Sequence, residues 1–160
     1  MSIRVGLGFD VHRLVAGRPC ILGGVLLEHD AGPEGHSDGD AVLHALCDAL
    51  LGAAGLDDLG TLFPDTDAKW KGADSAALLT EVLGRVRAAG WQLGNADIVI
   101  QTEGPRIAPA RALMRERMAK LCGVDRNCIN VKGKTLEGLG SMAHGAAVAV
   151  QVAVLVESVN

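Results

Sequence analysis

The stretch AAVAVQVAVLVESV, residues 146–159, alternates between two kinds of side chain with a period of two. Valine occupies every second position from Val148 to Val156, and the positions between them carry small or mixed side chains. Because successive side chains of a strand point to opposite faces of a sheet, this pattern predicts a strand with one uniformly apolar face. We expect helices to cover the valine face. The opposite face is either solvated, as in many antiparallel sheets, or packed against other copies of the chain.

The rest of the chain supplies the elements of a single domain, residues 1–160, of the α/β (α+β) class, with a mixed sheet covered by helices on one face. No linker, repeat or low-complexity tract interrupts it. Ser37 is the expected N-cap of the first helix, with Asp40 three residues later, and residues 74–75 cap the second helix. The predicted strands are residues 3–9, 20–27, 95–102, 128–134 and 146–159, and the predicted helices are residues 41–56, 76–89 and 109–123.

Composition and charge narrow the classes of function. The chain has a net charge of -4 and only two Trp and two Phe, with no Tyr. A nucleic-acid surface needs clustered Lys and Arg with rings for stacking, so the sequence indicates no nucleic-acid partner. No apolar run approaches the length of a membrane span, and no export signal is apparent, so we expect no membrane partner. Four cysteines without a C-x-x-C pair favour reduced thiols and a cytoplasmic protein; they are Cys20, Cys47, Cys122 and Cys128.

A candidate metal site lies near the N-terminus. Asp10 and His12 are two residues apart at the expected end of the first strand, so both side chains project to the same face. His44, on a helix expected to pack against that sheet, is the best candidate for a third ligand. Asp40 and Asp48 flank it at i-4 and i+4, where either carboxylate could orient the imidazole. Such a set can hold a zinc-like ion with one position open for catalysis. Alternatively, the D-x-H pattern is chance and His44 is an ordinary polar residue.

Three further polar segments suggest a phosphorylated substrate. HSDGD, residues 36–40, places a histidine and a hydroxyl at a helix start, where free N–H groups attract anions. FPDTD, residues 63–67, presents carboxylates in a loop. KGKTLEG, residues 132–138, combines a lysine and a threonine that suit a phosphate with a glutamate that suits magnesium. Each segment could also be a solvated loop. The absence of G-x-x-x-x-G-K-[ST] and G-x-S-x-G patterns argues against a P-loop NTPase and an α/β-hydrolase.

Three motifs in this order, GFDVHRL, HSDGDAVLHALCDALLGAAGLDDLG and LFPDTDAKWKGADS, closely resemble the 2-C-methyl-D-erythritol 2,4-cyclodiphosphate synthases. The similarity covers essentially the whole chain. It implies a homotrimer with active sites between neighbouring subunits, which would cover the second face of the sheet. It also implies the cyclisation of 4-diphosphocytidyl-2-C-methyl-D-erythritol 2-phosphate, a cytidine diphosphate substrate, with release of CMP in the non-mevalonate route to isoprenoids.

The resemblance carries roles to individual positions. It implies that Asp10, His12 and His44 bind Zn²⁺ or another divalent transition metal, and that Glu137 binds Mg²⁺ or Mn²⁺ at the substrate diphosphate. His36 and Thr135 fall where the family stabilises the transition state. The implied ribose contacts are Asp58, Leu59 and Gly60; the methylerythritol contacts are Ser37, Phe63, Pro64, Asp65, Thr66 and Asp67; the cytidine loop of the adjacent subunit is Thr102, Glu103, Gly104, Pro105, Arg106, Ile107 and Ala108; and Lys134 and Leu136 flank Thr135 at the phosphates.

The chain departs from the family pattern after Glu137. It reads LGSMAHGAA where many members read approximately LGFTGRGEG, so Ser141, His144 and Ala146 replace an aromatic residue, an arginine and a glutamate. The resemblance therefore does not carry the family's isoprenoid-diphosphate cavity over to this chain. Two other functions compete with the cyclising enzyme: a zinc-dependent phosphohydrolase that uses the same ligands to activate water, and a non-catalytic trimeric protein that binds isoprenoid phosphates.

Overall fold

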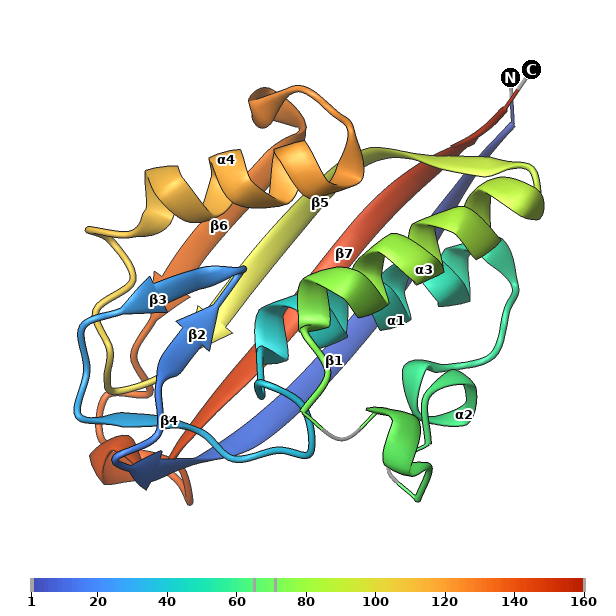
Figure 1. Cartoon of the computed structure of the whole chain (residues 1–160). Coiled ribbons are helices and arrows are strands. Elements are labelled where there is room, and N and C mark those ends of the chain that lie inside the picture. The colour runs from blue at the N-terminus through green and yellow to red at the C-terminus, as the bar shows by residue number, and fades with distance from the viewer. Residues whose placement is uncertain (1, 65, 71, 160) are drawn as a thin grey trace.

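A computed structural model describes residues 2–64, 66–70 and 72–159 of the chain (Figure 1). The strands are β1 (Ile3–Ala16), β2 (Cys20–Leu22), β3 (Val25–Leu27), β4 (Ala31–Pro33), β5 (Trp91–Gln101), β6 (Ile129–Lys134) and β7 (Ala147–Ser158). The helices are α1 (Ala41–Ala54), α2 (Leu59–Leu62), α3 (Ser75–Ala88) and α4 (Arg111–Cys122), with short 3-10 turns at Ala68–Trp70, Arg126–Cys128 and Ala143–Gly145. The mixed α/β fold of a single domain follows the expectation from the sequence.

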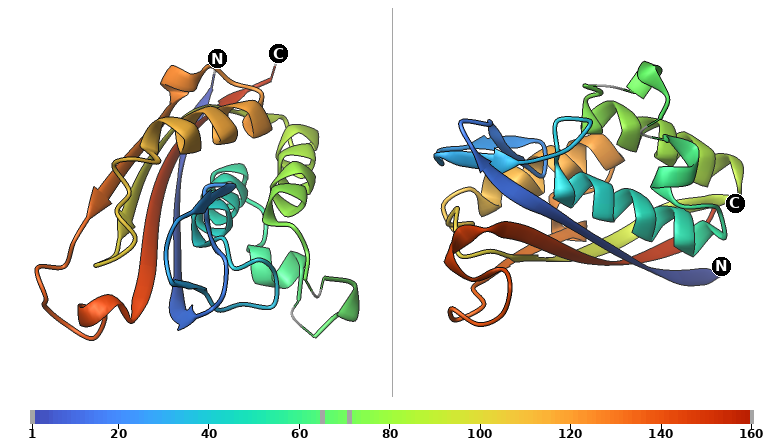
Figure 2. Two further views of the ribbon diagram at one scale, coloured as in Figure 1. Left: turned by 60° about the vertical axis from the view of Figure 1, so that its left-hand side comes forward. Right: turned by 90° about the horizontal axis from the view of Figure 1, so that it is seen from below.

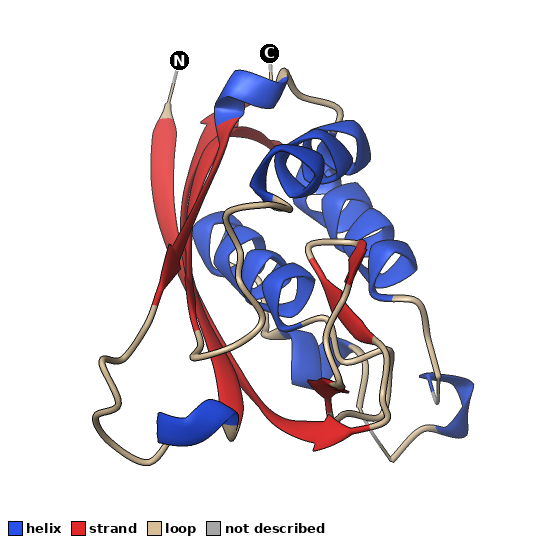
Figure 3. Ribbon diagram, turned by 90° about the vertical axis from the view of Figure 1, so that its left-hand side faces the viewer, coloured by secondary structure: helices blue, strands red, loops and turns tan. Residues whose placement is uncertain are grey.

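The main sheet has five strands in the order β4-β1-β7-β5-β6. Strands β5 and β6 are parallel, and α4 connects them, whereas the other neighbours pair antiparallel. Helices α1, α3 and α4 all lie on one side of this sheet (Figures 2 and 3). The two chain ends lie close together, at the ends of the paired strands β1 and β7. Among the described residues, no helix combines the length and the apolar character needed to span a membrane.

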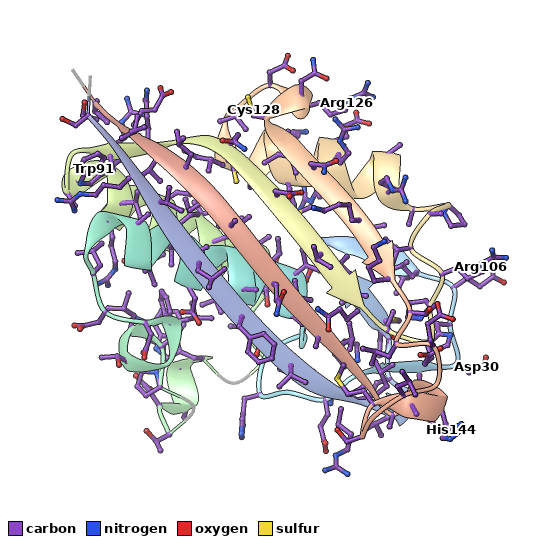
Figure 4. The ribbon with its side chains drawn as sticks, turned by 180° about the vertical axis from the view of Figure 1, so that it is seen from behind. Asp30, Trp91, Arg106, Arg126, Cys128 and His144 are labelled. Atoms are coloured by element: carbon purple, nitrogen blue, oxygen red, sulfur yellow. The ribbon has the colours of Figure 1, made fainter. Side chains whose placement is uncertain are left out.

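Strand β7 has the two faces that its alternation predicts. The valines from Val148 to Val156 are buried against the helices. On the other face, no long helix covers the strands when the molecule is seen from behind (Figure 4). There β1 exposes a row of large apolar side chains; they are Ile3, Val5, Leu7, Phe9 and Val11. This row is unusual for a solvated surface, because contiguous exposed apolar patches mark interaction sites.

Helix α1 approaches β1 closely because the facing residues are small. A Cβ atom on Gly6 would lie 1.9 Å from the carbonyl oxygen of Ala49, and one on Gly8 would lie 1.9 Å from that of Ala45. Neither distance is possible for a real side chain, so only glycine allows this packing. The strand and the helix are therefore held at backbone contact just before Asp10, which follows the two glycines on the same face.

Three local predictions are wrong. The predicted strand 20–27 is a hairpin of two short strands, β2 and β3, because Gly23 and Gly24 both adopt positive φ and form a tight turn. Strand β1 does not end at residue 9 but continues to Ala16, so the D-x-H pair lies inside it. The N-cap of α1 is Asp40 rather than Ser37: the Asp40 carboxylate accepts hydrogen bonds from the N–H groups at the start of the helix.

Candidate active site and metal centre

Two elements bring three metal-ligating side chains together. Asp10 and His12 project from β1, and His44 projects from α1, which the glycine contacts hold against that strand. Asp10 Oδ2 lies 2.8 Å from His12 Nε2 and 3.1 Å from His44 Nδ1, and the two imidazole nitrogens are 3.3 Å apart. All three potential ligand atoms lie within 4.8 Å of one another. One carboxylate and two imidazoles with this convergence fit a divalent metal ion.

Each histidine is held through the ring nitrogen that points away from the cluster. His12 donates its Nδ1–H to the backbone carbonyl of Glu34. His44 Nε2 lies 3.1 Å from Ser37 Oγ and 2.9 Å from Ser75 Oγ. Metal-binding histidines commonly use their second nitrogen in this way, because the outer hydrogen bond fixes the ring and its tautomer. The pattern therefore fits a metal site better than a chance cluster of polar groups.

The same contacts shift the proton affinities of the ligands. Burial favours the neutral form of Asp10, but hydrogen bonds from His12 and His44 outweigh it and hold the pKa of the carboxyl well below its usual range. Burial disfavours the charged form of His12, but the hydrogen bond and charge of Asp10 outweigh it and raise the pKa of the imidazole. Both shifts favour an ion pair between Asp10 and His12 in the metal-free protein, at the position that a cation would take.

The expectation that Asp40 or Asp48 orients His44 is wrong. Asp40 is fully buried and accepts hydrogen bonds from the N–H groups of Gly23 and Gly24 as well as from the start of α1. Burial raises its pKa to about 6 despite these donors. Asp48 accepts a hydrogen bond from the Leu59 N–H, and burial raises its pKa too. Both carboxylates therefore join loops to α1, and Ser37 and Ser75 contact the imidazole in their place.

A cavity of about 580 Å³ opens beside the three ligands. Its polar side carries His36 and Ser37, and its apolar side carries the edge-to-face pair Phe63 and Trp70, whose centroids are 4.8 Å apart. Leu59 and Gly60 also line it, whereas Asp58 caps α2 by accepting the Thr61 N–H. Pro64, Thr66 and Asp67 do not line the cavity, and Asp65 lies outside the described residues.

Most of the predicted cytidine loop lines a second, separate cavity of about 160 Å³. It is lined by Thr102, Glu103, Pro105, Arg106, Ile107 and Ala108 together with Arg111, Gly133, Lys134 and Thr135. Glu103 accepts the N–H groups of Leu136 and Gly138, so it ties this loop to the segment after β6. Thr135 donates a hydrogen bond to Glu137. Figure 4 shows Arg106 extending from the edge of the molecule.

The structure does not bring the two predicted transition-state residues together. His36 lines the metal cavity, Thr135 lines the second cavity, and no described residue of one chain lines both. The departing positions Ser141 and Ala146 line a third cavity on the end of the outer face. His144 lies between them in a turn, with a positive φ of 64°.

Sequence reasoning missed three groups at the site. Ser75 was predicted only as a helix cap and Asp38 was not singled out, yet both lie behind His44. Arg111, at the start of α4, adds a cation to the second cavity. Asp38 lies in the motif HSDGD and Ser75 in the motif GADS. Their pairing depends on a contact between residues 37 positions apart, which a single sequence does not reveal.

Comparisons with known proteins agree with this geometry. The model of the YgbB family matches residues 3–157. A 2-C-methyl-D-erythritol 2,4-cyclodiphosphate synthase of Bordetella avium is 50% identical over 97% of this chain and 96% of its own length. A solved structure of such a synthase in a CDP-bound form has a TM-score of 0.89 at 40% identity and covers 96% of this chain and 100% of that one. The bifunctional IspDF from Campylobacter jejuni matches with a TM-score of 0.95 at 40% identity, covering 99% of this chain and 43% of that one. The chain therefore belongs to the YgbB family, that of the 2-C-methyl-D-erythritol 2,4-cyclodiphosphate synthases.

Proposed function

We propose that Asp10, His12 and His44 hold a zinc ion in the reaction that converts 4-diphosphocytidyl-2-C-methyl-D-erythritol 2-phosphate to the cyclic diphosphate and CMP. The convergence of three ligand atoms beside an open cavity is the observation that carries this proposal. Both imidazoles present one nitrogen to the cluster and hold the other in a hydrogen bond, as zinc ligands do. When bound, zinc supplies a Lewis acid and a template for the substrate phosphate.

The protein needs no nucleophile of its own for this reaction. An oxygen of the substrate's 2-phosphate forms the new bond to the β-phosphorus, and the bond from that phosphorus to the bridging oxygen breaks, so that CMP leaves with the oxygen. The chain's residues fold the substrate and stabilise the charge on the phosphoryl group. His36 serves on the metal side, and Lys134 and Thr135 serve on the nucleotide side. Glu137 accepts a hydrogen bond from the Thr135 hydroxyl, and its carboxylate would hold Mg²⁺ or Mn²⁺ at the diphosphate.

The division of the site between two cavities supports a homotrimer with shared active sites. In one chain, the metal ligands line one cavity, and the cytidine loop lines another. A second copy can bring its cytidine loop to the metal cavity of the first. The outer face of β1 offers an apolar surface for this contact, since Val5 and Leu7 are 72% and 75% exposed in the single chain. The described cysteines are all unpaired, which fits a cytoplasmic enzyme.

Phosphorus NMR of the purified protein with the substrate, zinc and magnesium tests the reaction. We expect CMP to appear together with a cyclic diphosphate. A ring-opened phosphate would instead identify a phosphohydrolase that activates water. An unchanged spectrum from a folded, zinc-loaded protein would favour a binding protein for isoprenoid phosphates and would contradict the synthase.

Subunit mixing tests the shared site. His44→Ala removes a metal ligand, and Thr135→Ala removes a group on the nucleotide side, so each homotrimer should be inactive. After the two variants exchange subunits, some interfaces join an intact metal cavity to an intact nucleotide cavity, and we expect activity to return. Each variant put through the same exchange alone is the control. If mass spectrometry shows mixed trimers without activity, the two cavities do not combine across subunits.

A further inference from the structure

A chain of hydrogen bonds behind His44 ends in a carboxylate. Ser75 Oγ lies 2.9 Å from His44 Nε2, and Ser75 donates its hydroxyl proton to Asp38 Oδ1. Asp38 also accepts the backbone N–H of Ser75 at 3.1 Å and that of Asp40 at 3.1 Å. Ser75 has no solvent-accessible surface, so water does not compete for these contacts. The chain links the first residue of α3 to the loop before α1.

The chemistry of the donors and acceptors fixes the direction of this chain. A carboxylate only accepts hydrogen bonds, and a serine hydroxyl has one proton to give. Because Ser75 gives that proton to Asp38, its oxygen is left to accept the proton of His44 Nε2. With a metal ion bound, the neutral imidazole would therefore carry its proton on Nε2 and offer the lone pair of Nδ1, the nitrogen that faces Asp10 and His12.

We propose that Asp38 and Ser75 are positioning residues for the metal ligand His44: through one buried hydroxyl, they select its Nδ1-binding tautomer and fix its ring. The inference rests on the proposed use of the cluster as a metal site. The two histidines differ in what orients them. A backbone carbonyl, that of Glu34, holds His12, so the orientation of this ring does not depend on a neighbouring side chain. His44 depends on side chains instead, with Ser37 Oγ at 3.1 Å as a second partner.

Two substitutions interrupt the chain at different links. Ser75→Ala removes the hydroxyl and leaves Asp38 in place. Asp38→Asn keeps the shape of the side chain, but an amide has a single oxygen. In either orientation, its NH₂ group therefore faces the backbone N–H of Ser75 or of Asp40. Removing an outer partner of a metal-binding histidine weakens metal affinity by about 10- to 100-fold, and we expect losses in this range for both variants.

The protein offers a matched control for each variant. Thr80→Ala removes another hydroxyl from α3, one that only bonds the Ala76 carbonyl within the helix. Asp74→Asn removes a negative charge next to Ser75 while keeping a good N-cap for α3. The second control matters because Asp38→Asn also reduces the negative charge near a cation site. We expect both controls to bind zinc as the unmodified protein does.

The experiment titrates the metal-free proteins with zinc alone, in competition with a chelator, after circular dichroism has confirmed that each is folded. Long-range proton–nitrogen NMR of the zinc-loaded proteins then reports the His44 ring. We expect a protected Nε2–H signal in the unmodified protein and both controls, and its loss of protection in Ser75→Ala. Affinities equal to those of the controls would overturn the proposal, as would a loss confined to Asp38→Asn, since its charge alone would then be responsible.

The outcome does not depend on catalysis. If the unmodified protein binds zinc but forms no cyclic product, the proposed reaction fails and the ratio of zinc affinities still tests the positioning chain. If the unmodified protein does not bind zinc at all, the metal site itself is wrong, and the positioning proposal is overturned with it.

Discussion

Replacing Gly8 by alanine should damage the metal site without touching a ligand. The new Cβ would lie 1.9 Å from the Ala45 carbonyl oxygen, whereas real Cβ atoms essentially never approach closer than 3.0 Å. The contact is to backbone, so no side chain can rotate away, and α1 must retreat from β1 by about 1.1 Å, the difference between these two distances. His44 is the neighbour of Ala45 on the helix, so it moves away from Asp10 and His12 by a similar amount.

The size of this shift sets the expected effects. Overpacking of a tight interface costs about 1–3 kcal/mol of the free energy of unfolding. Metal–ligand distances tolerate only about 0.2 Å, so a retreat of this size removes His44 from the coordination of zinc. A misplacement of about 1 Å at an active site can lower the rate by about 100-fold, and we expect a loss of at least this order in turnover.

Urea unfolding of the metal-free protein, zinc titration against a chelator and CMP release measure the three effects. Gly52→Ala is the matched control, since it lies in α1 and its new Cβ would meet no atom within 4 Å outside the backbone of its own helix. It should be neutral or stabilise the protein by about 0.4–1 kcal/mol, because alanine reduces the entropy of the unfolded chain. Normal zinc affinity and turnover in Gly8→Ala would refute the reasoning that glycine contacts set the ligand distance.

Three further predictions concern the metals. His44→Ala should lose zinc and most activity while circular dichroism stays native, because two ligands hold the ion poorly; stoichiometric zinc in this variant would contradict the assignment. Glu137→Gln should keep zinc but lose the response of CMP release to magnesium, and an unchanged magnesium titration would give Glu137 another role. The pKa of His12 is raised in the metal-free protein, so below that pKa zinc must displace a proton from the imidazole. Zinc affinity should therefore fall by up to about tenfold per pH unit as the pH is lowered through this pKa. Chelator titrations that show the same zinc affinity across this pH range would exclude competition between zinc and a proton on His12.

The features that could be predicted from the sequence are those that depend on local periodicity. The alternation of β7 shows which face is buried, and the two-residue spacing of Asp10 and His12 places them on one face of β1. His44 could be added because an apolar helix following the strands was expected to pack against the sheet. For β7 and for the Asp10–His12 pair, the geometry follows from the pitch of a single strand, and the structure has the same arrangement.

The features that could not be predicted depend on contacts between segments. The division into β2 and β3 is different, because it had a local signal that was missed. The Gly23–Gly24 pair between two apolar runs is a recognisable hairpin signal and could have indicated this division. The role of Asp40 could not, because its carboxylate is drawn to the hairpin by N–H groups that only the fold brings near α1. The same holds for Ser75, whose partner Asp38 is remote in sequence.

The register of β1 links the metal centre to the outer surface of the subunit. The inward row of β1 begins with Gly6 and Gly8, which allow α1 to pack closely. The next two inward residues, Asp10 and His12, contact His44 of that helix. The outward row, between Ile3 and Val11, is apolar throughout. Because side chains alternate with a period of two, one register determines both rows, and a slip by one residue would exchange them. The long pairing of β1 with β7 therefore holds the metal ligands in the cavity and the apolar row at the proposed subunit interface at the same time.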